Sequence, residues 1–249
     1  MLTHRELVIL ILALTLDCYV RTGEIVGGKE VKPHSKPYMV LLEQHMEDGR
    51  AKNCDGFLLN EDFVMTAAHC KAWSSFALLG VHNARNISGT QRISVKTPFP
   101  HEDYREEDYE NDIMLLKLSS KANLTENVRP ITLASKADGS PKMCSVFGWG
   151  RKDRNVKNRS PILNGVNVTL ADNEKCDIDK TYCSVEVVGP AQGDSGGPLV
   201  CEDGKAHGVV SSNTLLSAEQ EIYIHRYTKI SAYTSWIDQI MEQQGKSYM

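Results

Sequence analysis

Short apolar runs, separated by turn-forming residues, constrain the fold of this chain more than any other feature of its sequence. Val, Leu, Ile, Phe and Tyr dominate the runs, whereas Gly, Asn, Asp and Ser stand between them. The clearest runs span residues 38–42, 57–59, 63–67, 113–118, 143–147, 166–170, 199–201 and 208–211. Runs of this length and composition are typical of β-strands, and a long series of them indicates a sandwich or a barrel. We therefore expect an all-β protein.

The C-terminus departs from this pattern. Apolar side chains recur there at Tyr233, Trp236, Ile237, Ile240 and Met241. Spacings of three and four residues place them on one face of a helix. We expect one amphipathic α-helix from residue 232 to about residue 242, docked on the β-structure. The polar stretch 119–129 is the best candidate for a connection between two halves of the chain.

Length and charge narrow the class of protein further. A chain of 249 residues with 41% hydrophobic residues can bury the core of one large all-β domain or of two small ones. Its net charge of −4 gives no reason to expect binding to nucleic acid or to an anionic membrane surface. We expect neither as a partner.

The first residues have the composition of a targeting segment. Arg5 precedes an apolar run at 7–16, which Asp17 then ends. This run is too short to cross a bilayer as a helix, but it fits the hydrophobic region of a secretory signal. We expect residues 1–22 to be a signal peptide, and the mature protein to be secreted to the extracellular space or into a secretory granule.

The seven cysteines agree with export. Cys18 lies in the expected signal peptide and should leave with it. The remaining six are Cys54, Cys70, Cys144, Cys176, Cys183 and Cys201. They suffice for three disulfide bonds in an oxidising compartment, and no pair has the spacing of a zinc site. We expect no metal.

Sequons for N-linked glycosylation also fit an exported protein. They occur at Asn86, Asn123 and Asn167. A fourth sequon, at Asn158, is followed directly by Pro161, which makes it a poor acceptor.

Three short motifs carry residues that can perform catalysis together. They are Thr66-Ala67-Ala68-His69-Cys70, Asn111-Asp112-Ile113-Met114-Leu115-Leu116 and Gly193-Asp194-Ser195-Gly196-Gly197-Pro198. Each alone has an ordinary structural explanation: a buried histidine, a strand-end cap and a tight turn. Together they supply a base, a carboxylate and a hydroxyl in the order His, Asp, Ser. A serine hydroxyl is a weak nucleophile that needs a base within hydrogen-bond reach, and histidine suits that task near neutral pH.

With these motifs, residues 25–241 resemble the chymotrypsin family of serine proteases and, more narrowly, granzymes and mast-cell proteases. The narrower resemblance rests on IVGGKEVKPHSKPYM at 25–39, on the dipeptide 23–24 before it, and on 193–201. It implies two six-stranded Greek-key β-barrels packed together, the first at about 25–130 and the second, with the C-terminal helix, at about 131–249. It also implies a monomeric serine endopeptidase of immune defence that acts on protein and peptide substrates, needs no cofactor and is controlled by serpin-type inhibitors.

The resemblance assigns roles to the motif residues. Ser195 is implied to be the nucleophile that forms an acyl-enzyme, His69 the base that takes its proton, and Asp112 the carboxylate that orients the histidine. The backbone N–H groups of Gly193 and Ser195 are implied to form the oxyanion hole.

The resemblance further implies a zymogen. Cleavage between Glu24 and Ile25 would free an α-amine that folds inward and pairs with Asp194. Glu24 is not the Arg or Lys that a tryptic activator requires. We expect a dipeptidyl peptidase to remove Gly23 and Glu24 after the signal peptide is cleaved following Thr22.

The family pattern also assigns the disulfides. The implied pairs are Cys54–Cys70, Cys144–Cys201 and Cys176–Cys183. A fourth family disulfide near the specificity pocket is absent, because Ala191 stands at one of its positions and no cysteine follows Cys201.

The substrate pocket follows from the same resemblance. Its implied residues are Gly189 and Pro190 at the base, Ser211, Ser212 and Asn213 on the wall, and His225 or Arg226 where some granzymes carry a basic residue. Gly189 is not the carboxylate that would pair with a Lys or Arg side chain. We therefore expect a non-basic residue at P1, the substrate residue before the cut, and both acidic and mid-sized apolar side chains fit.

Departures from the family pattern keep a second interpretation open. Ser212 replaces an aromatic residue, Asn213 replaces a glycine, and Asp55 replaces the second glycine after a cysteine. A catalytically weak or inactive binding protein with the protease fold would also fit, because a fold alone does not fix a function.

Overall fold

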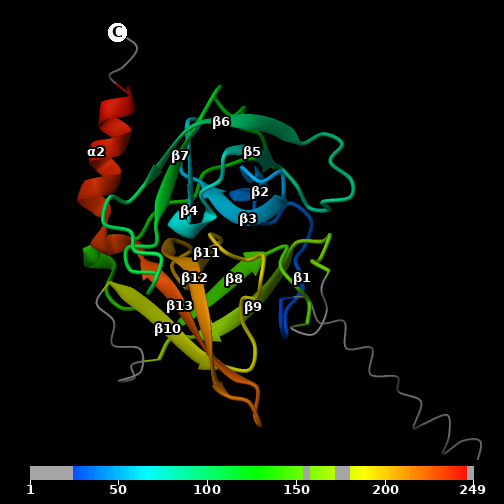
Figure 1. Ribbon diagram of the computed structural model, residues 1–249, viewed down its shortest axis with the longest axis vertical. Coiled ribbons are helices and arrows are strands. Elements are labelled where there is room, and N and C mark those ends of the chain that lie inside the picture. Colours follow the sequence, from blue (N-terminus) through cyan, green and yellow to red (C-terminus); the bar gives the residue numbers. More distant parts are fainter. Residues whose placement is uncertain (1–24, 154–157, 172–179, 246–249) are drawn as a thin grey trace, which may run out of the picture.

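The computed structural model describes residues 25–153, 158–171 and 180–245. Its strands form two sheets, and one α-helix follows at the C-terminal end of the described chain (Figure 1). The prediction of an all-β protein with a C-terminal helix is confirmed.

The first sheet closes into a barrel of six strands in the order β2-β3-β4-β7-β6-β5. These strands are β2 (Met39–His45), β3 (Ala51–Leu58), β4 (Phe63–Thr66), β5 (Ser74–Leu79), β6 (Gln91–Pro100) and β7 (Met114–Leu118). β4 and β7 are buried along their whole length. Strands buried on both faces read as continuous apolar runs rather than as alternating ones, which is why the sequence pattern identified them.

The second sheet has seven strands in the order β1-β9-β8-β11-β12-β13-β10. They are β1 (Lys29–Glu30), β8 (Met143–Gly148), β9 (Asn164–Thr169), β10 (Thr181–Glu186), β11 (Pro198–Cys201), β12 (Ala206–Ser217) and β13 (Ile222–Lys229). A bridge between Leu170 and Ser184 joins the end of β9 to β10, so strands β8 to β13 curl toward a second barrel. The extra strand β1 pairs with β9 at Gly165, where a side chain would collide with Phe147.

The two halves share one buried core. A single apolar cluster contains Phe57 and Leu42 of the first barrel together with Phe147 and Val209 of the second sheet. The connection between β7 and β8 contributes Val128 to the same cluster. Residues that face each other across the junction between the halves are therefore held in place by core packing on both sides.

The C-terminal helix α2 spans Thr234–Gly245 and follows a short 3₁₀ turn, η4 (Ile230–Ala232). It starts two residues later than the sequence predicted because that turn precedes it. The helix leaves the second sheet and packs beside the first barrel (Figure 1), where the His101 ring lies 5.2 Å from both the Tyr233 ring and the Trp236 ring. None of the described helices has the length and apolar character needed to cross a membrane.

Two of the three implied disulfides are formed between described residues. Cys54 of β3 is bonded to Cys70 of the 3₁₀ turn η1 (Ala68–Cys70), and Cys144 of β8 is bonded to Cys201 of β11. Cys183 is also disulfide-bonded, and its implied partner Cys176 lies outside the described residues. The first of these bonds anchors the turn that carries His69.

Candidate active site

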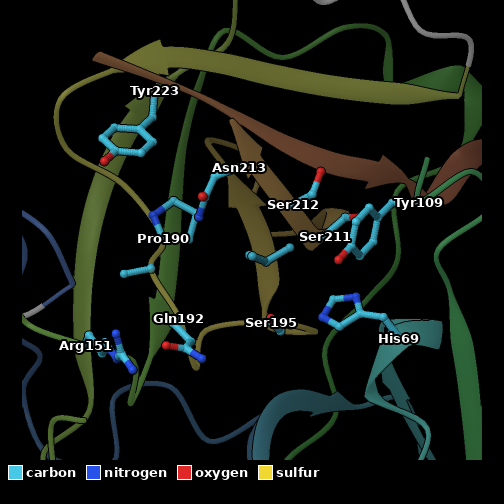
Figure 2. Close-up of a pocket in the computed structure, with 12 residues that line it drawn as sticks. His69, Tyr109, Arg151, Pro190, Gln192, Ser195, Ser211, Ser212, Asn213 and Tyr223 are labelled. Carbon is cyan, nitrogen blue, oxygen red and sulfur yellow. The ribbon is translucent and has the colours of Figure 1, made fainter. Parts of the chain in front are cut away.

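A hollow of about 410 Å³ opens at the junction of the two halves (Figure 2). The first barrel side contributes His69 and Tyr109 to its wall. The second half contributes Arg151, Pro190, Ala191, Gln192, Ser195, Val210, Ser211, Ser212, Asn213 and Tyr223. Segments far apart in sequence thus meet at one surface, as the three motifs predicted.

His69 is held by the turn that follows β4. It lies in the 3₁₀ turn η1, between the buried residues Ala68 and Cys70, so its backbone is fixed by the core and by the disulfide of Cys70. Its side chain is 14% exposed. The Tyr109 ring meets the His69 ring edge-on, with ring centres 5.5 Å apart. The imidazole is therefore oriented by packing and still reaches the hollow.

Asp112 is fully buried directly before β7 and accepts several hydrogen bonds. Its Oδ2 lies 2.8 Å from Nδ1 of His69, and its Oδ1 accepts the His69 backbone N–H at 3.0 Å. The Ser211 hydroxyl donates to Oδ2 at 2.5 Å, and the Thr228 hydroxyl donates to the Asp112 carbonyl at 2.9 Å. A buried carboxylate needs such donors. This network fixes the imidazole with Nε2 as the nitrogen left for chemistry.

Ser195 lies on the turn that leads into β11 (Pro198–Cys201). Its carbonyl accepts the Asp55 backbone N–H at 2.8 Å, which ties the turn to β3 of the first barrel. Its side chain and the His69 ring line the same hollow (Figure 2). Within the described part of the chain, no hydrogen bond joins the Ser195 hydroxyl to the His69 ring. Catalytic hydrogen bonds are commonly long in an empty site and shorten when substrate binds.

The backbone before Ser195 forms a tight turn. The Asp194 N–H donates to the Ala191 carbonyl at 3.0 Å, and Gly193 adopts φ +112°. That φ is in the range that favours glycine, which explains the glycine at this position. The N–H groups of Gly193 and Ser195 find no acceptor among the described residues, so both remain available to a negatively charged oxygen.

The carboxylate of Asp194 is buried behind this turn. The N–H groups of Gly150 and Ala191 donate to its two oxygens at 2.7 and 2.8 Å. Burial raises the pKa of Asp194 to about 6, although these two hydrogen bonds and the charge of Arg159 act to lower it. Ile25 is also fully buried, and Val26 pairs with Gly189, two residues before Ala191. The start of the described chain therefore packs against the same segment as Asp194.

The implied pocket residues divide into two groups. Four of them line the hollow: Pro190, Ser211, Ser212 and Asn213. Gly189 and His225 are buried and do not line the hollow. They pack against each other, since a Cβ on Gly189 would lie only 2.7 Å from Nε2 of His225. Of the two basic candidates, His225 is therefore the one that contacts the expected base residue. Arg226 instead donates to the Thr214 hydroxyl at 2.8 Å in an exposed position.

Several contributors were not identified from the sequence. Tyr109 had a local signal, because it stands three residues before Asp112. Ser211 was expected only as a pocket wall, and its hydrogen bond to Asp112 joins residues 99 positions apart. No local pattern predicts such a contact. The same holds for Arg151 and Tyr223, which reach the hollow from a loop and from β13.

The site offers little to a metal ion. Cys54, His69 and Cys70 carry potential ligand atoms within 4.8 Å of one another. The two sulfurs are bonded to each other, and a disulfide sulfur is not the thiolate that ligates metals.

Comparisons with known proteins agree with this geometry. Residues 25–237 match the model of a family described as Trypsin. Duodenase-1 of Bos taurus is 41% identical over 248 residues, covering 94% of this chain and 96% of the relative. Granzyme B of Homo sapiens is 39% identical over 250 residues, covering 95% of this chain and 98% of the relative. A solved structure of GrC superposes with a TM-score of 0.78 at 34% identity, covering 88% of this chain and 100% of that one.

Proposed function

Since the chain belongs to the trypsin family of serine proteases and is a serine endopeptidase related to granzymes and mast cell proteases, we propose that its catalysis uses His69, Asp112 and Ser195. Ser195 attacks the peptide carbonyl and forms an acyl-enzyme. His69 takes the hydroxyl proton and returns it to the leaving amine, while Asp112 stabilises the imidazolium. The N–H groups of Gly193 and Ser195 bind the oxygen of the tetrahedral intermediate.

One observation carries this proposal: the buried carboxylate of Asp112 is hydrogen-bonded to Nδ1 of His69 at 2.8 Å. The His69 ring and Ser195 line the same hollow. A base held by a third group beside a hydroxyl is the arrangement that nucleophilic catalysis requires.

A fluorophosphonate probe tests the proposal. The processed protein is expected to be labelled, and the Ser195→Ala variant is expected to stay unlabelled, because the probe reacts only with an activated hydroxyl. The alternative function, a binding protein with a protease fold, predicts no Ser195-dependent labelling. The unusual residues Ser212 and Asn213 would favour this alternative only if the protein that carries them is not labelled at Ser195.

We propose that the enzyme prefers non-basic P1 residues, either acidic or mid-sized apolar. Among the described residues lining the hollow none is acidic, so a Lys or Arg side chain would find no counter-charge there. The buried His225, which packs against Gly189, is the basic residue that we propose near the base. Cleavage of a peptide library mainly after Lys or Arg would overturn this preference.

Asn213 should limit the size of the P1 side chain. It lines the hollow from β12, at a position where the family carries glycine. We expect Asn213→Gly to raise kcat/KM for substrates with Phe or Tyr at P1 by about tenfold or more, since pocket volume commonly discriminates by this amount. Asn213→Ala should give an intermediate gain. Equal kcat/KM values for all three proteins on these substrates would contradict the assignment.

We propose that the protein is made as a zymogen and activated by removal of residues 23–24. In the uncut chain the nitrogen of Ile25 is an uncharged peptide nitrogen, and the buried Asp194 lacks a cationic partner from it. The raised pKa of Asp194, about 6, is the expected consequence of burial in this state. A new ammonium group at Ile25 would supply the missing charge, and a dipeptidyl peptidase fits the sequence before the cut.

This assignment predicts how the stability of the uncut chain depends on pH. The pKa of Asp194 rises from an ordinary 3.8 to about 6 on folding, so between these values the folded state binds more protons than the unfolded state. The free energy of unfolding must then fall as pH rises from about 4 to about 6, by roughly 3 kcal/mol from this group. Urea unfolding of the uncut chain at several pH values should show that fall.

Asp55 has a pKa that burial also raises, and it acts in the same direction. The share of Asp194 is therefore obtained by comparison with Asp194→Asn, which should show a clearly smaller fall. An identical pH dependence in the two proteins would contradict the assignment.

Secretion, glycosylation and an immune role complete the proposal. Asn86, Asn123 and Asn167 are exposed, which supports their use as glycan acceptors. The relatedness to granzymes and mast cell proteases supports a granule or extracellular location, a monomeric state, serpin-type inhibitors and a role in defence. We propose the signal peptide at 1–22 and a protease domain at 25–249, of which 25–130 and 131–249 are the two halves.

A further inference from the structure

Asp55 places a second carboxylate beside Asp194. Its side chain is fully buried, and its Oδ2 accepts the Trp149 N–H at 3.2 Å. A Cβ built on Gly148 would lie 2.2 Å from Oδ1 of Asp194 and 2.3 Å from Oδ2 of Asp55. The two carboxylate oxygens can therefore be no more than about 4.5 Å apart. Two ionised carboxylates this close repel each other, and a positive charge nearby reduces that repulsion.

Arg159 supplies that charge. It is half-buried, and its charge acts on both carboxyl groups to lower a pKa that burial raises. Its Nη2 donates to the carbonyl of Gly193. The guanidinium lies flat against that residue, since a Cβ on Gly193 would be 2.2 Å from Nε and 2.7 Å from Cζ of Arg159.

Two buried polar atoms in this cluster have no hydrogen-bond partner among the described residues. They are Nε of Arg159 and Oδ1 of Asp55. The charge of Arg159 acts to lower the pKa of the Asp55 carboxyl group, which burial raises well above its ordinary value, so the two groups attract each other.

The oxyanion turn, residues 191–195, is thus held by two hydrogen bonds. Asp194 accepts the Ala191 N–H at 2.8 Å. The Gly193 carbonyl accepts from Arg159. Fixing both peptide units around Gly193 fixes the direction in which the Gly193 N–H points. Stabilisation of an oxyanion depends on that direction.

We propose that Arg159 is a positioning residue that holds the oxyanion turn through the carbonyl of Gly193, and that the buried carboxyl group of Asp55 keeps the guanidinium in place. This inference rests on the proposed function, because the turn matters only if Gly193 and Ser195 bind an oxyanion. It also gives a role to Asp55, which replaces a glycine of the family pattern. The glycine at 193 serves the same arrangement, since any side chain there would displace the guanidinium.

Steady-state kinetics of the processed enzyme test the inference. The substrate is a chromogenic peptide with no residue after the scissile bond, so that Arg159 cannot act through contact with the leaving side of a substrate. We expect Arg159→Gln to lower kcat by about tenfold to a hundredfold, less than the loss of an oxyanion donor itself, and to leave KM within about twofold. Arg159→Lys keeps the charge and donors and should recover part of kcat.

Controls separate positioning from folding. Active sites are counted by burst titration, so that any unfolded fraction does not enter kcat, and Arg85→Gln serves as a matched exposed arginine variant that should leave kcat unchanged. Asp55→Asn should lower kcat in the same direction. The double variant Asp55→Asn with Arg159→Gln should lose little more than Arg159→Gln alone, because the two residues act as a unit.

The outcomes distinguish the two levels of the account. If the processed wild-type enzyme shows no Ser195-dependent turnover, the proposed function fails before any variant is compared. If the wild type is active but Arg159→Gln keeps kcat within twofold, the inference is overturned and the proposed function stands. A loss of kcat that Arg159→Lys does not recover in part would also overturn it.

Discussion

Replacing Ser195 by Ala is expected to lower kcat for peptide hydrolysis by about 10⁶-fold, the loss found when a triad nucleophile is removed. The methyl group cannot form the acyl-enzyme, whereas the N–H groups of Gly193 and Ser195 remain in place. KM should stay within a few-fold of its original value, because the residues that line the hollow are otherwise unchanged. Product formation in the processed variant, followed by chromatography over days, measures the loss.

The matched control is Ser119→Ala, which removes an exposed hydroxyl just after β7 that does not line the hollow. Its kcat should equal that of the unmodified enzyme. A Ser195→Ala enzyme that kept more than about a hundredth of the activity would show that another group performs the attack, since that residual exceeds what binding and the oxyanion hole alone provide.

The second large effect is expected for Asp112→Asn, with a fall in kcat of about 10⁴-fold. Asp112 accepts from Nδ1 of His69 at 2.8 Å and from the Ser211 hydroxyl at 2.5 Å. An amide in that place can direct an N–H at the ring nitrogen, which favours the tautomer that keeps its proton on Nε2. The ring can then no longer accept the proton of Ser195.

The pH profile provides the internal check on Asp112→Asn. Activity of this variant should recover in part at high pH, where hydroxide can replace the missing base. Substitution of Asp108, an exposed carboxylate paired with Arg105 in the same loop, serves as the control, and Asp108→Asn should retain full activity. An Asp112→Asn enzyme within tenfold of the original would contradict the role given to this carboxylate.

The parts of this protein that the sequence predicted are those set by local chemistry. Buried strands such as β4 and β7 appear as continuous apolar runs, and the helix α2 appears as a recurrence of three and four residues. The motifs around His69, Asp112 and Ser195 could be found because the proposed catalytic role of each residue also restricts which residue types stand next to it in the sequence. For the same reason two disulfides could be paired by resemblance and are formed.

What the sequence could not predict depends on contacts between distant segments. The hydrogen bond from Ser211 to Asp112 joins β12 to the loop before β7 across 99 positions of sequence. The pairing of β1 with β9 depends on the close approach that Gly165 allows. In the sequence, Asp55 is only a departure from the family pattern. In the structure, its carboxyl group is buried and interacts electrostatically with Arg159 and Asp194. Contacts of this kind depend on the direction in which each side chain points, and the spacing of residues in the sequence does not reveal that direction.

The two packed halves of the chain contribute different residues to the site. The first barrel fixes His69 and Asp112, and the second half fixes Ser195 and the oxyanion turn. The shared core and the Asp55 N–H bonded to the Ser195 carbonyl at 2.8 Å keep the two sets in register. Errors of about 1 Å between reacting groups can cost a hundredfold in rate, so we propose that this register serves catalysis.

The most direct test of the account is to trap the covalent intermediate. The processed enzyme is mixed with an ester substrate, quenched in acid after milliseconds, digested and examined by mass spectrometry. We predict one acyl group per active site, on the peptide that contains Ser195, and none in an enzyme carrying His69→Ala. An acyl group on any other residue, or turnover of the ester without an acyl-enzyme at Ser195, would contradict the account.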